Sequence, residues 1–147
     1  MLWILYILFI AGCLILSFVE DYNKNRFYKE TRIGARLLLD DGTNFNVYST
    51  ETIVGSGIDA DIRITDKNCP SAKNVERKQF ALMLKSDGYY IMNYSQNSRM
   101  LIERYGTIIE VKKNEKKYVE DQDKISFVGS NCKLSMTIDL QGENNYD

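Results

Sequence analysis

The chain opens on an apolar run and then changes character completely. No charged side chain precedes Glu20, and the residues from Leu2 to Val19 are almost all apolar. As an α-helix, which rises ~1.5 Å per residue, this run would be about 27 Å long, close to the hydrocarbon thickness of a bilayer. The pattern predicts a transmembrane helix over residues 2–19, with the rest of the chain held at a membrane.

Two other interpretations of the apolar run were weighed against this anchor. A cleaved signal peptide needs a positively charged start and a shorter apolar stretch, but no Lys or Arg precedes Trp3. The residues Ile10 to Cys13 (Ile-Ala-Gly-Cys) resemble a bacterial lipobox, in which the cysteine becomes lipidated. Lipoproteins usually turn polar directly after that cysteine, whereas this run stays apolar to Val19. We favour an uncleaved anchor, and an exported lipoprotein with a surface β-domain is the alternative.

The distribution of basic residues predicts the orientation of the anchor. Four basic residues follow the apolar run closely and none precedes it: Lys24, Arg26, Lys29 and Arg32. Such residues favour the cytoplasmic side, so we expect a single-pass cell-membrane protein whose C-terminal domain is cytoplasmic. Outside the anchor only Cys69 and Cys132 are cysteines, too few for a disulfide framework. This suits a reducing compartment, although a bridge between these two residues stays open.

The pattern after the anchor is typical of an all-β domain. Residues 20–34 are polar without clear periodicity and are predicted to be a juxtamembrane linker. From residue 35, short apolar or alternating runs recur roughly every 8–12 residues and end at turn residues, which indicates an antiparallel β-sandwich over 35–140. Residues 141–147 form a polar C-terminal tail. Roughly ten strands are expected, over residues 36–39, 45–49, 52–54, 61–64, 80–84, 89–92, 100–102, 107–111, 124–128 and 134–138.

The alternation within these runs also predicts which side chains face the core. The expected core residues are Leu37, Leu39, Val54, Ile62, Ile64, Leu82, Leu84, Ile91, Ile125, Phe127 and Ile138.

Composition excludes several classes of function. The net charge is −1, without the clustered basic excess of a nucleic-acid-binding domain. The chain has no histidine, which removes the usual nucleophile pairs and the common zinc ligands. It also has no glycine-rich phosphate loop. We therefore expect no enzyme, no cofactor, no metal site and no nucleic-acid partner.

The local clusters of charge are expected to be solvated turns. The stretch Lys112–Lys117 is locally basic and is predicted to be a hairpin turn. Three pairs of carboxylates are predicted to be solvated turn acids: Asp40 and Asp41, Asp59 and Asp61, and Asp121 and Asp123.

Four segments occur in an order that suggests a family. They are Thr-Ile-Val-Gly-Ser-Gly at 52–57 with the alternating run 59–64, Val-Glu-Arg-Lys-Gln-Phe-Ala at 75–81, Tyr-Ser-Gln-Asn-Ser at 94–98, and the closing segment 120–129. Together they resemble a forkhead-associated (FHA) domain over residues 35–140. The resemblance implies a β-sandwich whose loops at one end bind a phosphothreonine peptide of a partner protein.

The site residues that the resemblance implies depart from the family pattern. In that family a Gly-Arg pair, a Ser-x-x-His segment and an Asn-Gly pair form the site. Gly55 matches the glycine, but Ser56 stands where the phosphate-binding arginine belongs. Glu76 falls at the position of the serine, and Gln79 at that of the histidine.

The remaining candidate residues lie in the segments 94–98 and 75–81. Asn97 matches the asparagine that contacts the peptide backbone, whereas Ser98 replaces the glycine after it. Ser95 lies two residues before Asn97 in the same motif. Arg77 and Lys78 fill the variable places between Glu76 and Gln79.

These departures predict a degenerate site. An arginine offers phosphate a bidentate, charge-assisted pair of hydrogen bonds, whereas Ser56 offers one neutral donor. Glu76 places a like charge beside a group that carries nearly −2. We predict a membrane adaptor that binds a protein without phosphate. The alternative is a phosphothreonine reader that uses Arg77 and Lys78, as in bacterial kinase signalling or cell-wall and division complexes.

Overall fold

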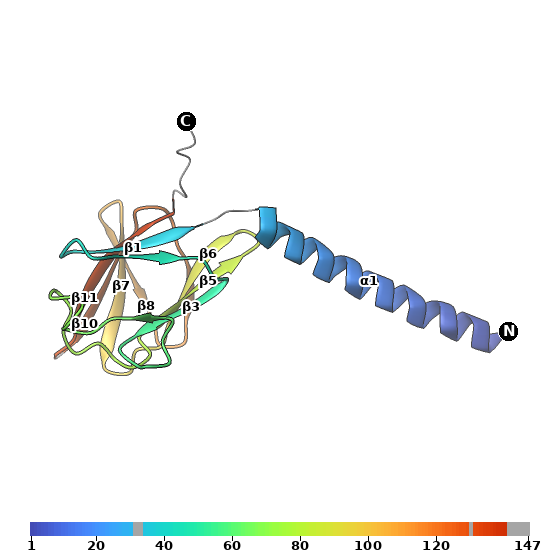
Figure 1. The fold of residues 1–147 in the computed structure, drawn as a ribbon, viewed down its shortest axis with the longest axis horizontal. Coiled ribbons are helices and arrows are strands. Elements are labelled where there is room, and N and C mark those ends of the chain that lie inside the picture. Colours follow the sequence, from blue (N-terminus) through green and yellow to red (C-terminus); the bar gives the residue numbers. More distant parts are fainter. Residues whose placement is uncertain (31–33, 130, 141–147) are drawn as a thin grey trace, which may run out of the picture. The chain divides into compact units, whose positions relative to one another are not determined.

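The computed structural model describes residues 1–30, 34–129 and 131–140, with only the backbone described for residues 21–30. The predicted tail, 141–147, lies outside the described residues. The chain divides into two compact units, Met1–Arg32 and Ile33–Asp147, each of which is described by itself (Figure 1). The first unit is one 29-residue helix, α1 (Leu2–Glu30). Its segment Leu2–Glu20 is long and apolar enough, by length and composition, to cross a membrane.

Helix α1 extends further than the apolar run predicts. The polar composition predicts a linker from residue 20, but the backbone stays helical to Glu30. Once a helix is nucleated, each added residue gains one backbone hydrogen bond at low cost. Residues 20–30 contain no proline or glycine and several good helix formers, so nothing in them ends the helix.

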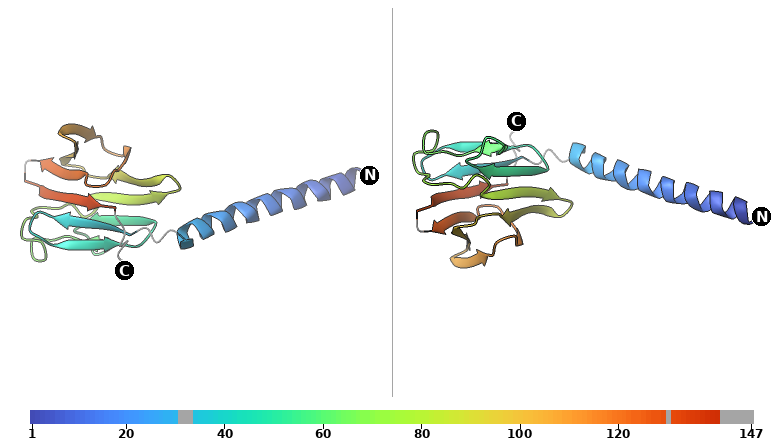
Figure 2. Two further views of the ribbon diagram at one scale, coloured as in Figure 1. Left: turned by 90° about the horizontal axis from the view of Figure 1, so that it is seen from above. Right: turned by 90° about the horizontal axis from the view of Figure 1, so that it is seen from below.

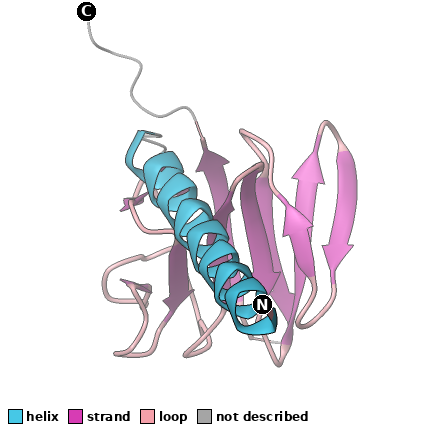
Figure 3. Cartoon of the chain, turned by 90° about the vertical axis from the view of Figure 1, so that its right-hand side faces the viewer, coloured by secondary structure: helices cyan, strands magenta, loops and turns pink. Residues whose placement is uncertain are grey.

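The second unit is a sandwich of two β-sheets (Figures 1, 2 and 3). Its strands are β1 (Ala35–Leu39), β2 (Asn44–Val47), β3 (Glu51–Gly55), β4 (Ile62–Arg63), β5 (Phe80–Lys85), β6 (Gly88–Asn93), β7 (Ser98–Arg104), β8 (Thr107–Val111), β9 (Lys116–Tyr118), β10 (Lys124–Gly129) and β11 (Lys133–Asp139). The six-stranded sheet has the order β2-β1-β11-β10-β7-β8, and the five-stranded sheet has the order β4-β3-β5-β6-β9. The predicted β-sandwich is confirmed.

One strand pair departs from the predicted antiparallel arrangement. Strands β3 and β4 run parallel, with Val54 opposite Ile62 and Gly55 opposite Arg63. A parallel pair normally needs a long crossover, whereas here only residues 56–61 separate the two strands. The Asp61 carboxylate accepts a hydrogen bond from the Ile53 N–H at 2.7 Å, which closes this short loop against β3.

Two tight turns contain residues whose backbone has a positive φ. Gly88, the first residue of β6, has φ +136°, a conformation that a side chain disfavours. Tyr105 and Gly106, between β7 and β8, both have positive φ, as a two-residue hairpin turn requires. The register of both hairpins therefore follows from the turn residues.

The core lies between the two sheets and contains every residue that the sequence predicted for it. All eleven predicted core side chains are buried. The Phe80 ring of β5 stacks on the Phe127 ring of β10 with 5.5 Å between centroids, which joins the two sheets. The buried apolar residues that the structure describes all lie at Ala35 or beyond, so the β-domain has a complete core of its own.

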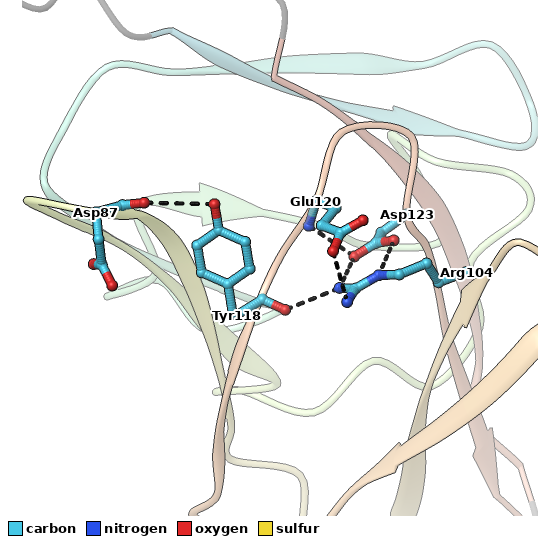
Figure 4. Close-up of polar contacts among 5 residues, drawn as sticks. All are labelled: Asp87, Arg104, Tyr118, Glu120 and Asp123. Atoms are coloured by element: carbon cyan, nitrogen blue, oxygen red, sulfur yellow. Dashed lines mark hydrogen bonds and ion pairs between the residues drawn. The ribbon is translucent and has the colours of Figure 1, made fainter.

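Two of the charged turn segments differ from the prediction. Strand β9 begins at Lys116, so the predicted turn over Lys112–Lys117 is only a turn in its first part. Asp123 is not a solvated turn acid, because it is 1% exposed. Its carboxylate pairs with the guanidinium of Arg104, at 2.9 Å and 2.5 Å (Figure 4).

Asp41 also takes part in the fold. Its carboxylate accepts hydrogen bonds from the N–H of Thr43 at 2.8 Å and from the N–H and hydroxyl of Ser71 at 3.1 Å and 3.0 Å. Hydrogen bonds from Thr43, and then from Ser71, lower the pKa of this carboxyl to about 2. Asp41 therefore ties the β1–β2 turn to the irregular segment before β5.

The separate core gives a direct prediction for the isolated domain. Residues 33–147, expressed without the anchor, should be soluble, monomeric and cooperatively folded, because no described core residue comes from the anchor. Circular dichroism should show a β-rich spectrum, and gel filtration should show a monomer. A helix-dominated spectrum would contradict the sandwich.

Candidate functional site

The strand order brings the three candidate loops to one end of the five-stranded sheet. Val54, near the end of β3, lies opposite Phe80 at the start of β5, and Phe80 lies opposite Asn93 at the end of β6. The segments 56–61, 75–79 and 94–97 therefore emerge side by side. The predicted site residues come together because antiparallel neighbours place one strand's end beside the next strand's start.

Gly55 allows two of these loops to touch. A Cβ atom on Gly55 would lie 2.1 Å from the carbonyl oxygen of Arg77 and 2.7 Å from its carbonyl carbon. No side chain fits there unless the backbone moves. The next residue uses this closeness, because the Ser56 N–H donates to the carbonyl of Glu76 at 2.9 Å. Gly55 is therefore required for close backbone approach.

Ser56 turns its hydroxyl into the protein. The hydroxyl donates its proton to the carbonyl of Val75 at 2.7 Å. The carbonyl of Ser56 accepts a hydrogen bond from Arg63 Nε at 3.1 Å. The one donor that Ser56 could offer to an external anion is thus already used within the loops.

Glu76 occupies the hydrogen-bond donors of the third loop. Its carboxylate accepts from the N–H of Gln96 at 2.9 Å and 3.0 Å, and from the N–H of Asn97 at 3.2 Å. The side-chain amide nitrogen of Asn97 lies at 3.5 Å from the same carboxylate. Successive backbone N–H groups that converge in this way form an anion-binding concavity, and here the anion is the chain's own glutamate.

The Gln79 side chain connects two of the loops through hydrogen bonds. Its side chain is fully buried, and its Oε1 accepts from the N–H of Glu76 at 2.9 Å. Its Nε2 donates to the Ser98 hydroxyl at 2.9 Å. One amide side chain therefore supplies an acceptor to one loop and a donor to another, which sets the backbone of Glu76 beside the third loop.

Ser95 belongs to the scaffold of the third loop. It is buried, and its N–H donates to Asn93 Oδ1 at 2.9 Å. Its hydroxyl lies 2.9 Å from the carbonyl of Ser98. Asn93 in turn donates from Nδ2 to the carbonyl of Val111 at 2.8 Å. Ser95 therefore shapes the loop and does not face outward.

Arg77 and Lys78 are exposed at the border of the loops. The Lys78 ammonium lies over the Tyr94 ring, 4.0 Å from its centroid. The backbone of Arg77 accepts a hydrogen bond from Gly57 at 3.1 Å, while its side chain is open to solvent. Neither residue reaches the Glu76 carboxylate within ion-pair distance among the described contacts.

Two cations of this region were not found from the sequence. Arg63 reaches Ser56 because the parallel pairing places it opposite Gly55, and no local pattern predicts that pairing. Lys113 of the β8–β9 turn donates to Gln96 Oε1. Its turn lies beside the site only because β8 and β9 belong to different sheets.

Comparison with solved structures identifies the fold. No family model matches the chain, and no curated protein matches its sequence. An engineered FHA domain with a Myc-pTBD peptide is 18% identical, with a TM-score of 0.57, and the match covers 74% of this chain and 91% of that chain. The N-terminal FHA domain of Rad53p from S. cerevisiae, in complex with a phosphothreonine peptide, is 19% identical with a TM-score of 0.56, over 74% and 94%.

A human domain gives the same result. The FHA domain of human APLF, in complex with an XRCC1 bisphospho peptide, is 22% identical with a TM-score of 0.55, and the match covers 72% of this chain and 97% of that chain. The β-domain therefore has the fold of forkhead-associated domains.

Proposed function

We propose that this protein is a single-pass membrane adaptor whose FHA-type domain lies in the cytoplasm and binds a partner protein without requiring phosphate. FHA domains in solved complexes bind phosphopeptides, which supports a protein-interaction role for the same loops in this chain. The proposed role is binding without catalysis.

The position of Glu76 is the observation that best supports binding without phosphate. Its carboxylate already holds the N–H groups of Gln96 and Asn97, the donors that an external anion would need. The Ser56 hydroxyl is also committed, to the carbonyl of Val75. An incoming phosphate would have to displace a tethered carboxylate to reach these donors.

Charge repulsion supports the same conclusion. A phosphothreonine carries nearly −2 at neutral pH. At ~5 Å and an effective dielectric constant of about 20, each pair of unit charges is worth roughly 3 kcal/mol before screening. Glu76 would therefore oppose phosphate at this position, and the Ser56 side chain offers no bidentate cation to offset this repulsion.

Phosphate independence is tested with a matched pair of peptides. The full chain in nanodiscs of neutral lipid should bind phosphothreonine peptides and their unphosphorylated twins with affinities that differ by no more than a few-fold. Fluorescence anisotropy against a peptide library measures this difference directly. Micromolar binding that depends on the phosphate would contradict the proposal and would show that Arg77 and Lys78 took over phosphate recognition.

The cytoplasmic orientation is a separate prediction. The basic residues that follow the apolar run favour the cytoplasmic side, so protease added to intact cells should leave the β-domain uncut. The exposed segment at Asn74–Lys78 is a suitable reporter of cleavage. Cleavage there from outside would overturn the orientation, and a lipid-sized addition to the mass at Cys13 would favour the lipoprotein alternative.

A further inference from the structure

A group of cationic side chains borders the three loops. Its members are Arg63, Arg77, Lys78 and Lys113, which we call the loop cations. Contacts link them to the site: Arg63 donates to the carbonyl of Ser56, Lys78 lies over Tyr94, and Lys113 donates to Gln96. All four side chains are exposed. Arg77 and Lys78 lie in the second loop, whereas Arg63 lies in β4 and Lys113 in the β8–β9 turn, and these contacts place the four beside the three loops as one basic border.

The loop cations differ from the arginines elsewhere in the β-domain. Arg36, Arg99 and Arg104 each pair with a carboxylate at 2.5–2.8 Å. Arg63 and Arg77 have no carboxylate within ion-pair distance in the described part of the chain. Unpaired arginines therefore gather at the loop end of a domain whose other arginines are neutralised.

Most acids near the loop cations are engaged by other groups of the chain. Glu76 is held by the donors of the third loop, and Glu115 accepts from the Lys112 N–H and pairs with Lys117. Asp59 and Asp61, in the loop after β3, are both exposed, and the Asp61 carboxylate accepts a hydrogen bond from the Ile53 N–H at 2.7 Å. The chain as a whole has a net charge of −1, so the basic border is a local feature.

The resident carboxylate shows which chemistry these loops accept. Glu76 is bound by two backbone N–H groups and approached by the Asn97 amide, so a carboxylate fits the loop donors without a phosphate. In the loop between β3 and β4, Ile58 is 82% exposed. The border thus combines unpaired cations with one exposed aliphatic side chain.

We propose that the partner binds these loops through an acidic, unphosphorylated segment. Its Asp and Glu side chains pair with the loop cations, and an apolar residue of the segment packs on Ile58. Complementary charge of this kind speeds association and selects partners. This inference rests on the proposed function and names the chemistry of its partner.

An acidic peptide suits this surface better than an anionic lipid layer does. Asp59 neighbours Ile58 in the exposed loop, and a lipid surface that covers Ile58 would meet this carboxylate with like charge. A peptide can place its carboxylates around Asp59 and opposite each cation. Binding of these loops to an anionic lipid layer is therefore treated as an alternative outcome of the test below.

The test uses the full chain in nanodiscs of neutral phosphatidylcholine and a labelled peptide of Asp, Glu and a single Leu. Its control is the twin with Asn and Gln in place of the acids. We expect the acidic peptide to bind at least about tenfold more tightly than its twin, the equivalent of ~1.4 kcal/mol, and to weaken as salt is added.

Variants of the chain locate the binding. Arg77→Ala and Lys113→Ala should each weaken binding of the acidic peptide by about two- to fivefold, the range of an exposed ion pair. Lys85→Ala is the matched control, because Lys85 ends β5 while the loops lie at its start. It should leave the affinity unchanged. All three side chains are exposed, so circular dichroism should confirm that the variants fold.

Several outcomes would overturn the inference. One is equal binding of the acidic peptide and its Asn/Gln twin. Another is an equal loss of affinity for the acidic peptide in Arg77→Ala and Lys85→Ala. Binding to nanodiscs of anionic lipid that depends on Arg77 and Lys113, without binding of the acidic peptide, would assign the border to the membrane instead. In each of these cases the phosphothreonine comparison still decides the proposed function, so the two failures are distinguishable.

Discussion

Replacing Arg104 by alanine should destabilise the β-domain by about 3–5 kcal/mol, the range for removing one partner of a buried ion pair. Arg104 pairs with Asp123 at 2.5 Å, approaches Glu120 at 3.2 Å and donates to the carbonyl of Tyr118 at 3.0 Å (Figure 4). Asp123 is 1% exposed, so its carboxylate would be left buried without its cation. Urea denaturation of residues 33–147 measures the loss.

Arg99 provides the matched control on the same strand. It also forms a two-bond pair with a carboxylate, Glu110, at 3.0 Å and 2.8 Å. Its side chain is 65% exposed, however, against 20% for Arg104. Arg99→Ala should therefore cost less than about 1 kcal/mol. Equal losses for the two variants would show that burial of Asp123 does not set the energy.

The double change Ser56→Arg with Glu76→Ser should create phosphothreonine-dependent binding. Removing the carboxylate frees the N–H groups of Gln96 and Asn97, and the new arginine supplies a bidentate cation beside them. One hydrogen bond to a charged group contributes about 1.5–3 kcal/mol, so a preference for phosphate of at least roughly tenfold is expected. Anisotropy with the same paired peptides measures it.

The single variants separate the two contributions. Glu76→Ser alone should give a weak preference for phosphate, because the donors are free but no cation stands at residue 56. Ser56→Arg alone should give little preference for the phosphorylated peptide, since the new guanidinium can pair with Glu76 instead. No phosphate preference in the folded double variant would contradict the assignment of these two positions.

The alternating pattern was enough to predict the core and every described strand except β9. Every predicted core residue, from Leu37 to Ile138, is buried, because the side-chain period of two leaves little choice of face once one face is apolar. The turn at Gly88 also depends only on local sequence, since glycine at this position accepts the positive φ that the backbone adopts there. The apolar run at the start needs no tertiary context either, since its length and composition already match a membrane span.

Long-range contacts could not be derived in this way. The sequence placed Asp123 in a turn, but only the neighbouring strands decide that its side chain is buried and faces Arg104. Likewise, the motif order predicted that Glu76 and Asn97 share a site, yet not that one would bind the other.

The sequence by itself therefore determined the apolar N-terminal run, the all-β class and the loops of the candidate site, because each depends on residues close together in the chain. The tertiary structure alone decided the parallel pairing that brings Arg63 to Ser56, and the carboxylate of Glu76 that fills the donors of Gln96 and Asn97. These contacts join residues 7 to 21 positions apart, and their geometry depends on how the strands of the five-stranded sheet pair.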